Sequence, residues 1–99
     1  MRLSAEQAAV IRDIVRAELG PSAQVRLFGS RTDDRARGGD IDLFVEADRP
    51  LENRAATASR LAALCQIRLG DQRIDVVLVD PTSAPQPIHA RARAEGLLL

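Results

Sequence analysis

Residues 40–46 read Asp-Ile-Asp-Leu-Phe-Val-Glu, and they carry the clearest structural pattern in the sequence. Its polar and apolar residues alternate, which is the period of a β-strand with one buried face. The apolar side chains that we expect to face the core are Ile41, Leu43 and Val45. The opposite face then carries two carboxylates one pleat repeat apart, followed by an aromatic and an acidic side chain: Asp40, Asp42, Phe44 and Glu46.

The segment before this strand predicts another strand and a functional loop. Residues 24–28 alternate around Val25 and Leu27 and end at Gly29-Ser30. Glycine lets the backbone approach a phosphate closely, and Ser30 offers a hydroxyl and a backbone N–H to the same phosphate. The polar residues 31–39 form a connection long enough to indicate a working loop. An ordinary turn would also explain Gly29-Ser30, but it would not predict the two-carboxylate strand that follows.

The pair Asp40 and Asp42 suggests a magnesium site. Two carboxylates so close together repel each other, and at least one pKa rises unless a cation lies between them. Mg²⁺ prefers oxygen ligands and typically takes one or two protein carboxylates together with substrate phosphates. An Asp-x-Asp pattern alone is a weak signal, because acidic residues are common at exposed strand ends. Gly29-Ser30 upstream strengthens it.

Asp75 is the third carboxylate of interest. It lies in Arg73-Ile74-Asp75-Val76-Val77, which we expect to be part of an inner strand, where a charge is costly unless it is paired or ligates a metal. If this strand lies beside the Asp40–Asp42 strand, the three aspartates form one site. Two ions held there would stabilise an in-line displacement at phosphorus. The alternative is that Asp75 pairs with Arg73 or another arginine.

The remaining segments predict three helices and a third strand. Ser4-Ala5-Glu6-Gln7 reads as a capping box that opens a helix ending at Gly20. A second helix would open at Asp48-Arg49-Pro50 and end at Gly70. Its buried stripe is expected at Leu51, Ala55, Ala58, Leu61, Ala62, Leu64, Cys65 and Leu69. A third strand over 73–79 and a short helix over 88–95 follow, and the order is α-β-β-α-β-α.

Composition narrows the function classes. The 99 residues form one domain, 1–99, and the net charge is zero, so the broad positive field of non-specific nucleic-acid binding is missing. The two aromatics, Phe28 and Phe44, lie in strand-like runs and offer no platform for stacking successive bases. Apolar runs are too short to span a bilayer, and we expect a cytoplasmic protein. The single cysteine, Cys65, is expected to pack in the core.

The combination of Leu27-Phe28-Gly29-Ser30-Arg31, nine further residues and Asp40-Ile41-Asp42-Leu43 resembles the signature of the DNA polymerase β-like nucleotidyltransferase superfamily. The resemblance is closest to its minimal nucleotidyltransferases and covers nearly the whole chain. It implies an α/β (α+β) fold, with a small mixed β-sheet and helices packed on its non-catalytic face. One departure is Gly39, where the family often has serine.

The resemblance also implies roles for individual residues. Gly29, Ser30 and Arg31 would hold the triphosphate of ATP. Asp40, Asp42 and Asp75 would be the catalytic residues and would bind Mg²⁺, with Asp75 helping to activate the acceptor hydroxyl. Pyrophosphate would leave, and a nucleoside monophosphate would remain on the acceptor. Members of this type are often encoded beside a small helical HEPN-type protein, and several neutralise that toxin by adding AMP to a tyrosine.

We therefore predict an adenylylating antitoxin whose site is completed by a partner subunit or a second copy. Two other function classes stay open. One is a non-catalytic antitoxin that blocks its partner by occlusion, and the other is a transferase acting on a small molecule or an RNA end. Larger relatives use extra domains for the latter. A P-loop NTPase does not fit, because the chain has no G-x-x-x-x-G-K-[ST] motif.

Several further residues have competing explanations. Arg31 would either clamp phosphates or belong to a solvated loop, and a solvated loop is preferred for Arg35 and Arg37. His89 is expected to serve a surface or partner contact and not catalysis. The apolar residues 97–99 would either fold back onto the core or dock on a partner.

Overall fold

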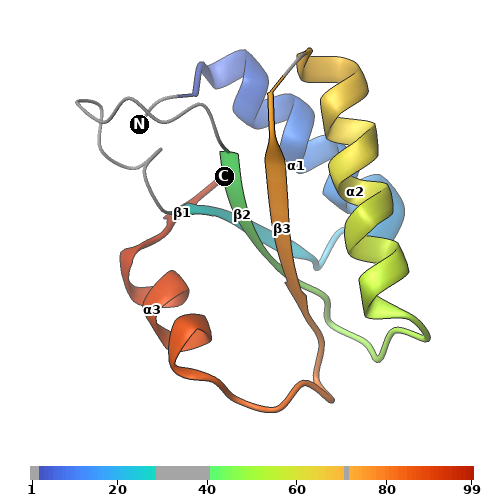
Figure 1. Ribbon diagram of the computed structural model, residues 1–99, viewed down its shortest axis with the longest axis vertical. Coiled ribbons are helices and arrows are strands. Elements are labelled where there is room, and N and C mark those ends of the chain that lie inside the picture. The colour runs from blue at the N-terminus through green and yellow to red at the C-terminus, as the bar shows by residue number, and fades with distance from the viewer. Residues whose placement is uncertain (1–2, 29–40, 71) are drawn as a thin grey trace.

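A computed structural model describes residues 3–28, 41–70 and 72–99 (Figure 1). The elements follow the order α1 (Ala5–Leu19), β1 (Gln24–Phe28), β2 (Ile41–Glu46), α2 (Arg54–Leu69), β3 (Ile74–Val79), α3 (Pro87–Glu95) and β4 (Leu97–Leu98). The predicted order α-β-β-α-β-α is confirmed, and β4 is an addition at its end. Gly29, Ser30, Arg31 and Asp40, which are four of the predicted site residues, lie outside the described residues.

Helix α1 begins at the predicted capping box. The Ser4 hydroxyl accepts a hydrogen bond from the backbone N–H of Gln7, and the Gln7 side chain accepts one from the backbone N–H of Ser4, both at 3.0 Å. These two bonds satisfy backbone donors that have no partner inside the helix. Gly20 ends the helix with a φ of 99°, a conformation that favours glycine. Ile11, Val15 and Leu19 form its buried stripe.

The four strands form one mixed sheet in the order β3-β2-β1-β4. Strand β2 is antiparallel to β1 and parallel to β3, and α2 provides the crossover that a parallel connection needs. Strand β3 therefore lies at an edge of the sheet. The expectation of an inner strand around Asp75 was wrong, because the strand that pairs with the other side of β2 is β1 and nothing in the described chain pairs with the outer side of β3.

The main core lies between one face of the sheet and helices α1 and α2 (Figure 1). Ile41, Leu43 and Val45 point into it as the alternation predicted, and each is at most 1% exposed. The prediction that helices pack on one face holds for α1 and α2. Helix α3 packs on the opposite face, where Ala92 contacts Phe44. Phe44 is fully buried, and an aromatic ring on that face needs its own cover.

Helix α2 begins later than the sequence suggested. Its N-cap is Asn53, whose side chain accepts a hydrogen bond from the backbone N–H of Ala56 at 3.0 Å. The Asp48-Arg49-Pro50 segment is not helical, and the backbone N–H of Leu51, which follows it, donates to the side chain of Asp80 at 2.8 Å. The predicted stripe is buried at Leu61 and Cys65, whereas Ala55 is exposed.

The chain after α3 folds back onto the sheet. Strand β4 pairs antiparallel with β1, and the backbone N–H of Leu99 donates to the carbonyl of Val25 at 3.0 Å. The turn into β4 is tight at Gly96, where a Cβ would lie 2.4 Å from the carbonyl oxygen of Ala92 and 3.2 Å from the Cβ of Arg26. Of the two expectations for the tail, the described residues therefore show the return to the core.

Candidate functional site

The face of the sheet away from α1 and α2 carries the predicted carboxylates. Because Cα partners in adjacent strands point to the same side, the register defines rows of side chains across this face. One row runs Phe28, Asp42, Asp75, and the next runs Arg26, Phe44, Val77. Two of the three predicted aspartates are thus direct neighbours on adjacent parallel strands, at the ends of β2 and β3 that lead in from residues 40 and 73.

The environment of Asp42 and Asp75 suits a hard divalent cation. Asp42 is partly buried, whereas the side chain of Asp75 is 48% exposed, so a ligand can reach the row from solvent. The donor set is made of carboxylate oxygens, which Mg²⁺ prefers. Within the described part of the chain, no group of three or more His, Cys, Asp or Glu residues could hold a metal ion. The third predicted ligand, Asp40, lies outside that part, so its role stays a prediction.

Asp75 has a cationic neighbour, Arg73, which lies two residues before it on the same face of the sheet. The Nε atom of Arg73 lies 3.5 Å from Oδ2 of Asp75, and both side chains are largely exposed. This is the contact that the alternative explanation of Asp75 expected. An exposed ion pair of this length contributes about 0–1 kcal/mol, so it leaves the carboxylate available to a stronger ligand.

Helix α3 packs on the sheet beside the carboxylate row and covers Phe44. The His89 ring stacks on Phe44 with centroids 5.7 Å apart, and the guanidinium of Arg93 lies 5.4 Å from the centre of the same ring. Arg93 also donates from Nε to Glu46 at 2.9 Å, and Arg26 of β1 pairs with the other oxygen of Glu46. These contacts fix α3 against β2 at Phe44 and Glu46, and Phe28 of the Asp42 row packs against the same apolar cluster.

The packing of α3 against Phe44 and Glu46 was not predicted from the sequence. Sequence reasoning placed Phe44 and Glu46 on the correct face and His89 on a surface helix, but it did not connect them. A signal was available in α3, where His89, Ala92 and Arg93 share the i, i+3, i+4 spacing of one helix face. An aromatic residue on an otherwise polar strand face, together with such a helix face, indicates a second packing layer.

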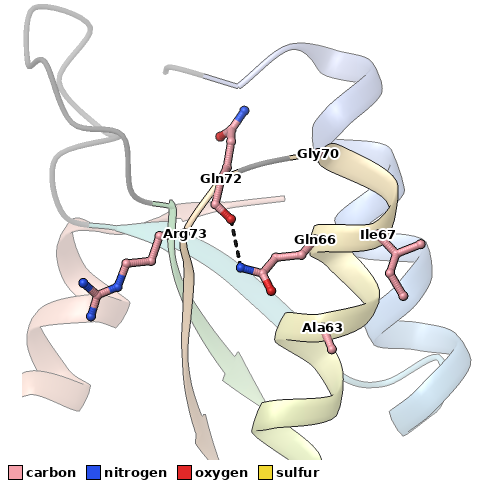
Figure 2. A pocket seen from close by; sticks show the side chains of 6 residues that line it. All are labelled: Ala63, Gln66, Ile67, Gly70, Gln72 and Arg73. Atoms are coloured by element: carbon pink, nitrogen blue, oxygen red, sulfur yellow. Dashed lines mark hydrogen bonds between the residues drawn. The ribbon is translucent and has the colours of Figure 1, made fainter.

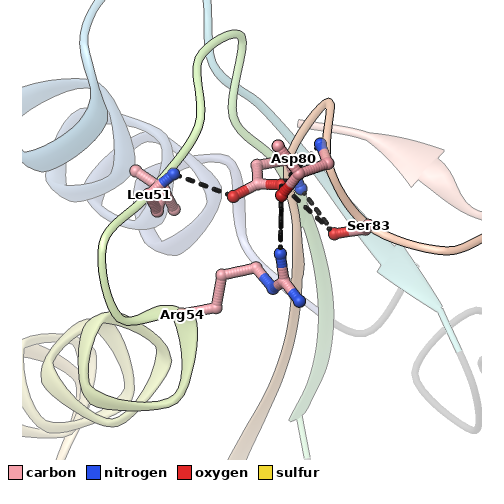
Figure 3. Close-up of polar contacts among 5 residues, drawn as sticks. Leu51, Arg54, Asp80 and Ser83 are labelled. Carbon is pink, nitrogen blue, oxygen red and sulfur yellow. Dashed lines mark hydrogen bonds and ion pairs between the residues drawn. The ribbon is translucent and has the colours of Figure 1, made fainter.

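Asp80 forms a separate carboxylate centre at the far end of β3 (Figure 3). Its side chain is completely buried and accepts hydrogen bonds from the backbone N–H of Leu51 at 2.8 Å and from Arg54 at 3.1 Å. The backbone N–H and hydroxyl of Thr82 donate at 2.8 and 2.6 Å, and the Ser83 hydroxyl lies at 3.5 Å. Asp80 therefore ties the end of β3 to the segment that leads into α2.

These donors hold the pKa of Asp80 well below its ordinary value of 3.8. The largest cause is the hydrogen bond from the Thr82 hydroxyl, followed by that from the Leu51 N–H, while desolvation acts in the opposite direction. Sequence reasoning missed this residue. The run Asp80-Pro81-Thr82-Ser83 carried the signal, because aspartate followed two and three residues later by hydroxyl side chains is typical of an Asx-type turn.

An open pocket of about 610 Å³ lies where the end of α2 meets the start of β3 (Figure 2). It is lined by Ala63, Gln66, Ile67, Gly70, Gln72 and Arg73. The Gln66 side chain donates to the Gln72 carbonyl at 3.0 Å across it. Figure 2 shows the Arg73 side chain directed away from α2, toward the carboxylate face. Neither of the two predicted catalytic residues that the structure describes, Asp42 and Asp75, lines the pocket, so we do not assign the chemistry to it.

Cys65 behaves as the sequence predicted. It is fully buried in the main core, and burial raises the pKa of its thiol to about 11. A neutral, enclosed thiol packs as a small apolar side chain. Among the described residues, no helix is both long and apolar enough to cross a membrane.

Comparison with known proteins identifies a family and a similar solved structure. The family model described as "Nucleotidyltransferase domain" matches residues 9–93. No curated protein matches the chain. The chain is also similar to a solved structure described as the crystal structure of the toxin-antitoxin MntA-HepT, with 26% sequence identity and a TM-score of 0.66. That likeness covers 96% of this chain and 70% of the other.

Proposed function

The chain belongs to the nucleotidyltransferase domain family, and we propose that it transfers AMP from ATP to a hydroxyl group of a partner protein. The prediction of a minimal nucleotidyltransferase of the DNA polymerase β-like superfamily is confirmed by the family match and the structural likeness together. The nucleotide, the metal and the acceptor are our proposal.

One observation carries the proposal. Asp42 and Asp75 are Cα partners in adjacent parallel strands, on the face that α1 and α2 leave open. The family chemistry needs carboxylates on neighbouring strands that can share one cation, and this register supplies two of them. The stretch 41–45 anchors the pair, because Ile41 and Leu43 are buried on the reverse side of the same strand.

The residues divide the work as follows. Asp40, Asp42 and Asp75 would hold Mg²⁺, and Gly29, Ser30 and Arg31 would hold the triphosphate. Bound Mg²⁺ would offset the charge of the phosphate oxygens and favour ionisation of the acceptor hydroxyl. The acceptor oxygen would bond to the α-phosphorus while the bond from that phosphorus to the bridging oxygen breaks. Pyrophosphate would leave with the bonding electrons, and Asp75, the more exposed of the described pair, would take the hydroxyl proton to solvent.

The structural likeness supports a proposal for the partner. The similar solved structure is a complex of a toxin and an antitoxin. We propose that this chain is likewise the antitoxin of a pair, acting in the cytoplasm on a small helical HEPN-type protein. The carboxylate row lies beside the part of this face that α3 covers at Phe44, and a partner that docks there would complete the site.

The direct experiment is a transfer assay read by intact mass. The chain is mixed with the HEPN-type protein proposed as its partner, ATP and Mg²⁺, and the partner should gain the mass of AMP. Asp42→Asn should abolish the gain. The matched control is Asp13→Asn, which removes the same charge from α1, where the side chain is 74% exposed.

The outcomes separate the remaining function classes. Absence of the adduct with the wild-type chain would refute adenylylation of that partner. Neutralisation of the partner that persists in Asp42→Asn without any adduct would favour inhibition by occlusion. An adduct that forms equally well with Asp42→Asn would show that the assigned carboxylates are not the catalytic ones.

A further inference from the structure

Arg73 occupies a particular position relative to the carboxylate row. It precedes Asp75 by two residues and shares its face, and its Nε lies 3.5 Å from Oδ2 of Asp75. Figure 2 shows its side chain directed away from α2. Its backbone is fixed, because its carbonyl accepts a 2.8 Å hydrogen bond from the N–H of Ile41, the residue before Asp42. The side chain is 73% exposed and has space to move.

The position of Arg73 affects the electrostatic repulsion between two neighbouring carboxylates. Asp42 and Asp75 are neighbouring acidic residues on one sheet face, and a positive charge beside them reduces their mutual repulsion. Arg73 does this for Asp75 through an ion pair that is exposed and long. Such a pair is weak and is screened by salt, so a divalent cation can displace it at small cost.

We propose that Arg73 is a positioning residue that guards Asp75. Its guanidinium holds the Asp75 carboxylate while the metal site is empty, competes with the incoming cation, and is released when the cation binds. This inference rests on the proposed function, because it takes Asp75 to be a metal ligand. Arg73 therefore weakens metal binding. The metal concentration at which the site is half-occupied is higher than it would be without the Arg73 charge.

The test measures binding of Mn²⁺ alone to the full chain, without nucleotide, by electron paramagnetic resonance of the unbound ion. Loss of the Arg73 charge should tighten binding about tenfold at low salt in Arg73→Gln, which is the factor that Coulomb's law gives for a unit charge roughly 6 Å from a divalent ion in water. Arg73→Lys should restore wild-type affinity. The tightening should shrink in high salt, where the interaction is screened.

Arg91→Gln is the matched control. Arg91 forms an ion pair with Glu95 at 3.4 Å on α3, and its side chain is 75% exposed, so both variants remove one charge from a similar exposed pair. If Arg91→Gln tightens Mn²⁺ binding as much as Arg73→Gln, the effect reflects net charge and the guard is refuted. Equal affinity of Arg73→Gln and the wild type would also refute it.

A double variant distinguishes failure of the guard from failure of the proposed function. In an Asp75→Asn background, Arg73→Gln should have no further effect, because the carboxylate through which Arg73 acts is gone. If Asp75→Asn leaves Mn²⁺ affinity unchanged, Asp75 is not a metal ligand and the proposed site itself is wrong. If Asp75→Asn weakens binding and Arg73→Gln matches the wild type, Asp75 is a metal ligand but Arg73 does not compete with the metal for it.

Discussion

Asp75 and Asp80 lie on the same stretch of chain, five residues apart, yet their surroundings are opposite. Asp80 is enclosed, and its two oxygens accept hydrogen bonds from a backbone segment, an arginine and two hydroxyl side chains. Asp75 is half exposed and contacts Arg73 at 3.5 Å. A carboxylate with its hydrogen-bonding capacity filled by the protein stabilises the fold, whereas one left open to solvent can bind a ligand. A structural carboxylate and a candidate ligand thus lie five residues apart, one in β3 and the other directly after it.

Glu46 stands between the two. Its side chain is 24% exposed, and Arg26 and Arg93 share its oxygens. Both of its partners belong to elements around the open face, β1 and α3. Because their surroundings differ, Asp75, Asp80 and Glu46 should respond differently when each is replaced by its amide.

The largest expected effect is on transfer in Asp75→Asn. The variant should lose about a thousandfold in rate, because charge stabilisation by a bound cation contributes several kcal/mol to phosphoryl chemistry. The melting temperature should stay the same or rise slightly, since a neutral amide beside Asp42 repels it less. Initial rates and thermal unfolding of the same preparation measure both. A fall in melting temperature with intact transfer would mean that Asp75 stabilises the fold and does not take part in the reaction.

Asp80→Asn should show the reverse pattern. The amide cannot accept hydrogen bonds at its nitrogen, so buried donors from Leu51 or Thr82 lose their partner. We expect the melting temperature to fall by roughly 10 °C, as for other losses of a buried hydrogen-bonded network in a domain of this size. Transfer at low temperature should change little. Differential scanning calorimetry gives the first quantity, and an unchanged melting temperature would contradict the structural role of Asp80.

Acid should sharpen the same contrast. The pKa of Asp80 is depressed in the folded state, so its contribution is fully present above its unfolded value of 3.8 and is lost as the pH falls further. The wild type should therefore take up roughly one more proton on unfolding below pH 4 than Asp80→Asn does. Urea unfolding at pH 5, 4, 3 and 2 measures this difference. Parallel pH profiles of the two proteins would refute it.

The smallest effect is expected for Glu46→Gln. The variant weakens two partly exposed arginine contacts, each of which contributes about 0.5 kcal/mol, so the melting temperature should fall by about 5 °C. Transfer should decrease only modestly, because Glu46 fixes α3 and does not contact the reacting atoms. Loss of transfer as complete as in Asp75→Asn would mean that Glu46 belongs to the catalytic site.

Much of the architecture was predictable because local signals and packing agree. The capping box at Ser4, the alternation of residues 41–45 and the glycine ends of α1 and α2 each gave a correct element. The adjacency of Asp42 and Asp75 followed from supposing that the third strand lies beside the second, which the register confirms. Their metal-binding role stays a prediction.

What could not be predicted depends on contacts between distant segments. The position of β3 at the sheet edge is set by which neighbours β2 acquires, and alternation along a single strand does not carry this information. Asp80 gains its importance from Leu51 and Arg54, about thirty residues away, so only its local turn was visible in the sequence. The placement of α3 opposite α1 and α2 likewise depends on Phe44 needing cover.

The pairing of β4 with β1 has a consequence for how the molecule assembles. Leu27 and Leu97 are register partners although they are about seventy residues apart in the chain. During synthesis, β1 can pair with β2 long before residue 97 leaves the ribosome, but its other edge must wait. Contacts between such distant segments form slowly, and an unpaired strand edge can template association with other chains. We therefore expect the outer edge of β1 to remain unpaired in the nascent chain until the turn at Gly96 brings β4 into place.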